Sequence, residues 1–393
     1  MSRSPLAEIN YEILRWARET SGLDIADAAS KIGTSPERLE EWENGDSYPT
    51  VKRLRQLARA YMRPMGLFFL PELPDDPERI KDFRKVSEAP EEEMSSALRF
   101  EIRLAWERRH EAVDLASELA EEFKGISYHV SLRDDPDQVA IELRKHLAIS
   151  VAEQANWSTK WEAFTSWRSA IESLGILVFQ TGVFRNLIVD PMEARGFSIS
   201  EEPLPVIVVN GKDHASAKCF TLNHELVHIF LHEGGICDLH DPFSTSSYSD
   251  RAEVFCNRVA GAVLVPAEVL LNDNVVRGHG RGPVWSDDEL RQLSRRFWVS
   301  WEVILRRLLI LNRTTQEYYQ DWRRRSRDQF PGPADASENI KIPAHTRVVI
   351  RNGKLFPRLV LRALREKVIT MYEASDILQA GPDRLVDVEN AVH

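Results

Sequence analysis

The spacing of apolar residues predicts four short helices at the amino-terminal end of the chain. Apolar side chains recur there at helical intervals, and Gly22, Gly33 and Gly45 separate the segments. Ser35 followed by Pro36 fits an N-cap and a first helical position. We therefore expect a compact, all-α domain over residues 1–70. Its helices are predicted at 11–20, 24–32, 35–44 and 51–61.

A charged amphipathic pattern follows a linker that is rich in proline and aspartate. Residues 71–77 form this linker, and residues 92–124 place apolar side chains near helical spacing among many charges. The pattern predicts one long helix, which is either a scaffold between domains or a homodimer surface. Residues 71–134 thus connect two domains. A strand at 125–133 and a helix at 137–147 are expected to lead into the second domain.

In the middle of the chain, the sequence predicts a largely apolar helix. This helix, residues 220–232, carries polar side chains at His224, Glu225 and His228. Burying these groups without partners is costly, so we expect them to face one shared pocket.

The sequence His224-Glu225-Leu226-Val227-His228 has the spacing of a zinc site. On a helix its two imidazoles lie one turn apart on one face, and Glu225 lies beside them to deprotonate a water. A catalytic zinc takes a third protein ligand, and Glu253 heads the apolar face of a second predicted helix. Alone, Glu253 would fit an exposed acid in a first helical turn. Beside the upstream motif it is predicted as the third ligand, with Asn257 orienting it.

These segments resemble the ImmA/IrrE family of zinc metallo-endopeptidases, whose ligand helices have the forms FTLAHELGH and ExxANxFAxxLLMP. The resemblance covers about residues 135–315, and Asn223 and Cys256 stand where the family usually has alanine. It implies a zincin-like α+β catalytic domain over residues 135–325 that binds one Zn²⁺ per chain. The resemblance also implies short strands before the motif helix, which we therefore predict at 174–179, 195–198 and 205–210. The implied ligands are His224, His228 and Glu253, and the implied general base is Glu225.

The group that would stabilise a developing oxyanion is not evident from the motif. His214, His232 and Tyr248 lie near it, but each fits a structural role better than a catalytic one. Residues 237–240 contain one cysteine and one histidine, which cannot complete a structural zinc site. We predict a loop there.

The amino-terminal helices resemble the Xre-type helix-turn-helix, which places its third helix in the major groove of DNA. The resemblance rests on Ile25-Ala26-Asp27-Ala28-Ala29, Thr34-Ser35-Pro36, the run from Leu39 to Gly45, and Pro49-Thr50. However, residues 35–46 contain five acids, namely Glu37, Glu40, Glu41, Glu43 and Asp46, against the single base Arg38. Phosphates repel such a helix. DNA contacts would then come from Lys52, Arg53 and Arg55 together with Arg38 in a dimer; a protein–protein module is an equal alternative.

Two further elements follow the metal motif. Residues 287–311 predict a second helix-turn-helix-like pair, which either contacts DNA or an acidic partner or closes the peptidase core. Its bases are Arg291, Arg295, Arg296, Arg306 and Arg307. Residues 340–393 predict a small α/β element. It is expected to hold a hairpin across residues 351–354 and helices at 357–366 and 371–379.

Composition narrows the class of protein. The chain has 393 residues, enough for two to four domains, and its net charge of -10 argues against a nonspecific nucleic-acid coat. Three cysteines suggest no disulfide framework, and we find neither a signal peptide nor a membrane span. A cytoplasmic protein is expected.

Two functions of different class follow. The first is a zinc-dependent metallo-endopeptidase that cleaves a regulatory protein, such as a repressor, in a stress or mobile-element response. The second is an Xre-type transcriptional regulator or antitoxin of a toxin–antitoxin operon. In that case the zincin domain binds a partner protein such as a toxin, and the helix-turn-helix binds an operator.

Overall fold

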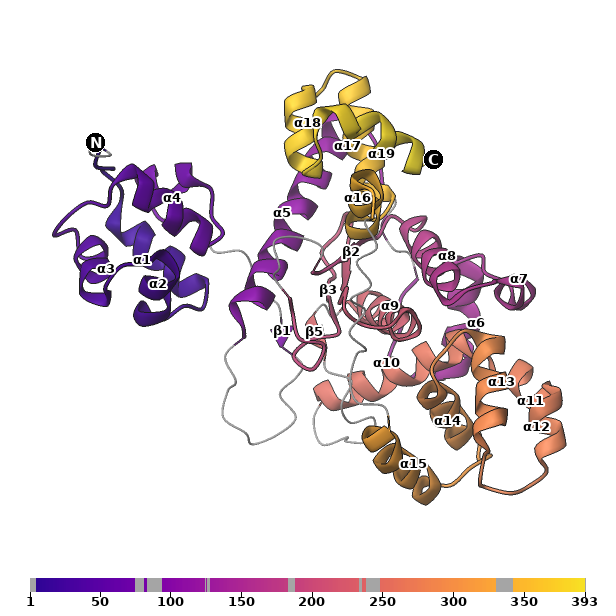
Figure 1. The fold of residues 1–393 in the computed structure, drawn as a ribbon. Coiled ribbons are helices and arrows are strands. Elements are labelled where there is room, and N and C mark those ends of the chain that lie inside the picture. The colour runs from indigo at the N-terminus through magenta and orange to yellow at the C-terminus, as the bar shows by residue number, and fades with distance from the viewer. Residues whose placement is uncertain are drawn as a thin grey trace. The chain divides into compact units, whose positions relative to one another are not determined.

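The computed structural model shows a mainly helical chain with one small sheet (Figure 1). It describes residues 5–74, 81–82, 94–123, 125, 128–182, 188–232, 235–237, 248–329 and 342–392. The chain divides into two compact units. The first comprises Met1–Arg79 with Glu88–Trp106, and the second comprises Ile80–Ser87 with Glu107–His393.

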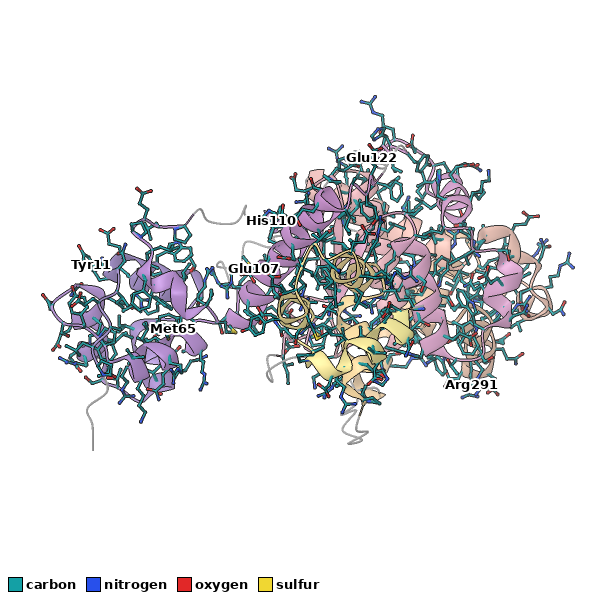
Figure 2. All side chains as sticks on the ribbon, turned by 90° about the horizontal axis from the view of Figure 1, so that it is seen from above. Tyr11, Met65, Glu107, His110, Glu122 and Arg291 are labelled. Carbon is teal, nitrogen blue, oxygen red and sulfur yellow. The ribbon has the colours of Figure 1, made fainter. Side chains whose placement is uncertain are left out.

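The amino-terminal unit is the all-α helix-turn-helix domain that the sequence predicts. Asn10, Asp24, Ser35 and Thr50 each cap a helix by accepting a hydrogen bond from a backbone N–H in its first turn. Figure 2 shows Tyr11 and Met65 among the side chains of this unit. Its elements are α1 (Tyr11–Thr20), α2 (Ile25–Ile32), α3 (Pro36–Glu43), α4 (Val51–Ala60) and η1 (Met65–Phe69).

The sheet of the second unit has five strands in the order β1-β5-β3-β4-β2. The three predicted strands correspond to β2 (Leu177–Gln180), β3 (Gly196–Ile199) and β4 (Val206–Val209). β2 pairs parallel with β4, and β3 pairs antiparallel with both β4 and β5. β1 (Lys81–Asp82), which pairs parallel with β5 (Gly235–Cys237), was not predicted from the sequence.

Two local predictions around the sheet need revision. The strand expected at 125–133 is wrong for residues 128–133, where the chain bonds through Val130 N to Phe230 O at 3.2 Å and then turns at Ser131. Part of the predicted loop at 237–240 is strand, because Cys237 ends β5, and its other residues lie outside the described part.

Both faces of the sheet are covered, which explains why its strands read as continuous apolar runs. Val178 and Ile207 point into the core that contains α9 (Ala215–Phe230). Phe179 points to the opposite face, where its ring lies 5.7 Å from that of Phe356. α5 (Ser96–Glu118) covers this second face through Arg108, whose guanidinium lies 5.0 Å from the Phe179 ring centroid.

Helices on the α9 side complete the core of the second unit (Figure 1). The helix predicted at 137–147 and the two helices predicted within 287–311 are confirmed. No described helix is long and apolar enough to cross a membrane. These helices are α6 (Pro136–His146), α7 (Val151–Asn156), α8 (Lys160–Glu172), α10 (Tyr248–Leu264), α11 (Ala267–Asn272), α12 (Asn274–His279), α13 (Asp287–Phe297), α14 (Trp301–Ile310) and α15 (Gln316–Gln329).

The carboxyl-terminal element is helical, so the predicted α/β element with its hairpin at 348–356 is wrong. The β-branched run at 348–350 suggested a strand, but Val348, Arg351 and Asn352 are the buried residues, which is helical spacing. Gly353, with φ of 71°, ends this helix instead of forming a hairpin turn. The elements are α16 (Ala344–Asn352), α17 (Leu355–Arg365), α18 (Met371–Leu378), η2 (Pro382–Arg384) and α19 (Leu385–Val392).

Two charged side chains of α8 hold this element by the ends of its helices. Arg168 donates from Nη1 to Ile350 O at 2.7 Å and from Nη2 to Val178 O, joining the last turn of α16 to β2. Glu172 accepts from the backbone nitrogens of Lys354 at 2.8 Å and Leu355 at 3.2 Å, where α17 begins. A cation at a helix carboxyl end and an anion at an amino end both complement the helix dipoles.

We predict that Arg168→Met lowers the free energy of unfolding by about 2–4 kcal/mol, because several buried carbonyls lose their donor. Urea unfolding measures this. Arg362→Met is the matched control, because Arg362 pairs with Glu366 on the surface and should change stability far less. Equal losses in the two variants would contradict the assignment of Arg168.

Candidate metal centre

Helices α9 and α10 pack together and bring the three predicted ligands to one point. The Nε2 atoms of His224 and His228 lie 3.1 Å apart. Glu253 Oε2 lies 3.2 Å from His224 Nε2, and Glu253 Oε1 lies 3.2 Å from His228 Nε2. All three residues are buried, at 0%, 0% and 5% exposure. The structure therefore places residues from two separate sequence segments in one polar cluster.

This cluster fits a metal ion. Ligands placed about 2.0–2.1 Å from a tetrahedral zinc lie about 3.3 Å from one another, close to the separations seen here. Both carboxylate oxygens of Glu253 are buried and have no hydrogen-bond partner among the described residues. Each imidazole Nε2 faces one of these oxygens at 3.2 Å. Two imidazoles with one carboxylate form a donor set that catalytic zinc uses.

The charges agree with this geometry. Burial alone would raise the pKa of Glu253, but the neighbouring imidazoles of His224 and His228 hold it below its ordinary value. Glu253 is therefore an anionic carboxylate, which is the form that binds a cation. Burial raises the pKa of the Cys256 thiol to about 11, although His228 acts in the opposite direction. The cysteine that replaces the usual alanine is thus a neutral neighbour of the cluster.

Glu225 lies beside the ligands on α9 and faces the sheet. It is 1% exposed, and its Oε2 accepts a hydrogen bond from Ser198 Oγ at 2.8 Å. Burial raises the pKa of Glu225, and the two imidazoles and Ser198 partly oppose this effect. A buried carboxyl group beside the ligands is placed to accept a proton and to return it.

Gly196 on β3 allows α9 to approach the strand this closely. A Cβ at this position would lie 2.5 Å from Thr221 Cγ2, 2.8 Å from Val208 O and 3.4 Å from Glu225 Oε1. Neither Gly196 nor Ser198 was predicted from the sequence as a residue of the site. The sequence offered one indication of their role: Gly196 and Ser198 are two residues apart in a predicted strand and therefore lie on the same face.

Asn257, His214 and His232, which were also considered from the sequence, form no described hydrogen bond with the cluster. Asn257 is one turn beyond Glu253, but the bare carboxylate oxygens of Glu253 show that it does not hydrogen-bond them. His232 is exposed and lies 2.8 Å from His129, measured between Nε2 and Nδ1. His214 is exposed at the start of α9, and the side chain of Tyr248 lies outside the described part.

The four predicted DNA-contacting bases occupy different environments in the helix-turn-helix domain. Lys52 and Arg55 are exposed on α4. Arg53 donates to Ile32 O and to Gln56 Oε1, and thus joins α4 to the end of α2. Arg38 forms an ion pair with Glu41 on α3 itself.

The second basic helix pair is less basic on its surface than its sequence suggests. Arg307 is 1% exposed and donates to Val265 O at 2.9 Å and to Asp137. Arg306 bonds to Glu302 and to the hydroxyl of Tyr319, both at 2.8 Å. These two bases bond within the core, as expected if the helix pair closes the core of the second unit. Arg291 lies on the surface of α13 (Figure 2).

A buried His-His-Glu cluster on two helices, beside a small sheet, is typical of a metallopeptidase domain. Comparison with known families agrees, because residues 171–309 match the IrrE N-terminal-like domain of the Peptidase_M78 family. Residues 14–67 match a helix-turn-helix family. The predicted combination of an ImmA/IrrE-type domain with an Xre-type domain is thereby confirmed. A search of curated proteins finds no match to this chain.

We predict that Gly196→Ala lowers the free energy of unfolding by about 1–3 kcal/mol, because its methyl group pushes β3 away from α9. Urea unfolding again gives the value. Gly278→Ala is the control, since Gly278 lies in helix α12 and a Cβ added there would meet no atom within 4 Å. It should leave stability unchanged or raise it. A Gly196→Ala protein as stable as this control would refute the close-approach argument.

Proposed function

We propose that this protein is a zinc-dependent metallo-endopeptidase that cleaves a regulatory protein, such as a repressor, and carries a DNA-binding helix-turn-helix domain. The observation that carries the proposal is the convergence of three buried ligand residues: the two imidazole Nε2 atoms lie 3.1 Å apart, and each lies 3.2 Å from one oxygen of Glu253. His224, His228 and Glu253 would hold one Zn²⁺ per chain. Glu225 supports the enzymatic reading, because a site that only bound metal would not need a buried carboxylate beside the ligands.

In the proposed reaction, different residues of the chain have different roles in peptide hydrolysis. A zinc ion held here would polarise the scissile carbonyl and acidify a water. Glu225 takes the proton of the attacking water and returns it to the leaving amine. Ser198 fixes the orientation of that carboxylate through its 2.8 Å hydrogen bond. The apolar walls of α9 and α10 exclude bulk water, which strengthens each electrostatic interaction within the site.

Two substitutions separate metal binding from chemistry. Glu253→Ala should reduce bound zinc from one equivalent per chain to a small fraction, because two ligands remain. Glu225→Gln should keep the zinc but lower the cleavage rate by about 10²–10⁴, because it removes the general base. Elemental analysis by mass spectrometry measures the metal. Incubation with candidate repressor proteins, followed by peptide mass spectrometry, measures cleavage.

Glu268→Ala, an exposed acid on α11, controls for loss of a carboxylate and should keep both metal and activity. If wild-type protein purified without chelator holds no metal, the zinc assignment fails. If Glu225→Gln retains full biological activity, the peptidase assignment fails. That result would instead support a regulator or antitoxin whose metal domain binds a partner such as a toxin.

The exposed bases of α4 support operator binding as a second role of the same chain. Arg55→Met should weaken binding to the promoter of its own gene and reduce the salt dependence of that binding, because one phosphate contact is lost. Arg53→Met is the informative comparison, since Arg53 already bonds to Ile32 O. It should lower the melting temperature of the domain, whereas Arg55→Met should not. Unchanged promoter affinity in Arg55→Met would rule out this contact surface.

A further inference from the structure

A small apolar pocket opens between α9, α10 and α14, next to the ligand cluster. Its walls include Phe220 of α9, Val254 and Gly261 of α10, and Val303 and Ile310 of α14. Neither the metal ligands nor Glu225 line it. It is therefore a separate cavity that the proposed chemistry leaves unexplained.

The pocket is joined to the ligand cluster along both ligand-bearing helices. Phe220 lies one turn before His224, and the centroids of their rings are 6.2 Å apart. Val254 follows Glu253 directly, and Asn257 also lines the pocket one turn later. Residues that line the pocket therefore lie within one helical turn of ligands on both α9 and α10.

Gly261 keeps the α10 wall of the pocket open. It lies inside a 17-residue helix, where glycine is a weaker helix former than alanine. Its φ is not positive, and a Cβ there would meet nothing within 4 Å. Neither backbone conformation nor packing thus requires glycine. What the missing side chain leaves is open space on the pocket wall.

The charges around the pocket favour one kind of occupant. Arg306 and Arg307 line it, but their guanidinium groups bond to Glu302 and to Asp137. Arg258 also lines it, is exposed, and forms no ion pair with any residue that the structure describes. The pocket thus has apolar walls and one available cation, which complements a large apolar side chain next to a carboxylate.

We propose that this pocket binds a large apolar side chain of the polypeptide substrate beside the scissile bond, with Arg258 favouring an adjacent acidic residue. Gly261 then determines specificity by leaving room for that side chain. The inference rests on the proposed function only in assuming that the metal centre faces a polypeptide. The pocket can select a bound side chain by its size and apolar character even if the protein cleaves no polypeptide.

Binding of two peptide hydroxamates to the zinc-loaded protein tests this selectivity. The compounds differ only in the side chain next to the hydroxamate, which is isobutyl in one and methyl in the other. Isothermal calorimetry should show the isobutyl compound binding at least about tenfold more tightly, because an apolar pocket discriminates by that much per methylene or more. Gly261→Leu should abolish this preference by filling the pocket, and should leave affinity for the methyl compound within about twofold.

Gly261→Ala is the matched control, because it adds only one methyl group to open space and should keep the preference. Val254→Phe fills the pocket from a partly exposed position, so it provides a second filled variant if Gly261→Leu does not fold. Arg258→Gln should reduce the gain in affinity from an added aspartate in the compound, with zinc content unchanged.

Equal binding of the two compounds by wild-type protein would overturn the inference, as would an unchanged preference in both filled variants. Failure of the proposed function looks different. A protein that keeps the isobutyl preference but cleaves no polypeptide has the pocket without the peptidase activity. A protein that cleaves polypeptides with no preference between isobutyl and methyl has the activity without the specificity pocket.

Discussion

The core of the second unit depends on the burial of four polar side chains between two apolar helices. His224, Glu225, His228 and Glu253 are each 5% exposed or less. Two carboxyl groups and two imidazoles at such depth are costly unless something compensates their charge. A divalent cation does this, and its binding free energy is then also folding free energy. The same ion that supports hydrolysis would thus fix the packing of α9 against α10.

Contacts elsewhere in the unit hold the side chains of this cluster and the neighbouring sheet in position. On the sheet side, Gly196 lets α9 approach β3, and the hydroxyl of Ser198 orients Glu225. On the far side, Arg168 and Glu172 of α8 bond to the ends of α16 and α17, and Phe356 packs on Phe179 of β2. The carboxyl-terminal helices therefore pack on β2 at the face of the sheet opposite α9.

Predictions from sequence succeeded where the cause is local. Helical spacing determines that His224 and His228 share a face, and N-cap residues such as Ser35 locate helix starts. Contacts between distant segments carry no such local signal, so the closeness of Gly196 to Thr221 was missed. The hairpin at 348–356 failed for the same reason. β-branched residues favour strands. Here, however, Val348 is buried on the inner face of α16, and Arg168 of α8 donates to Ile350 O in the last turn of α16. These contacts override the strand preference.

The number of acidic residues in the sequence of α3 also differs from the number that the folded helix exposes. Glu43 contributes to the acidic count of α3, yet it is 2% exposed and pairs with Arg18 at 2.9 Å, so it joins α3 to α1. Glu41 is neutralised by Arg38. The acids that remain at the surface of α3, Glu37 and Glu40, still repel phosphate. By contrast, α4 carries exposed bases such as Lys52 and Arg55 and contains no acidic residue.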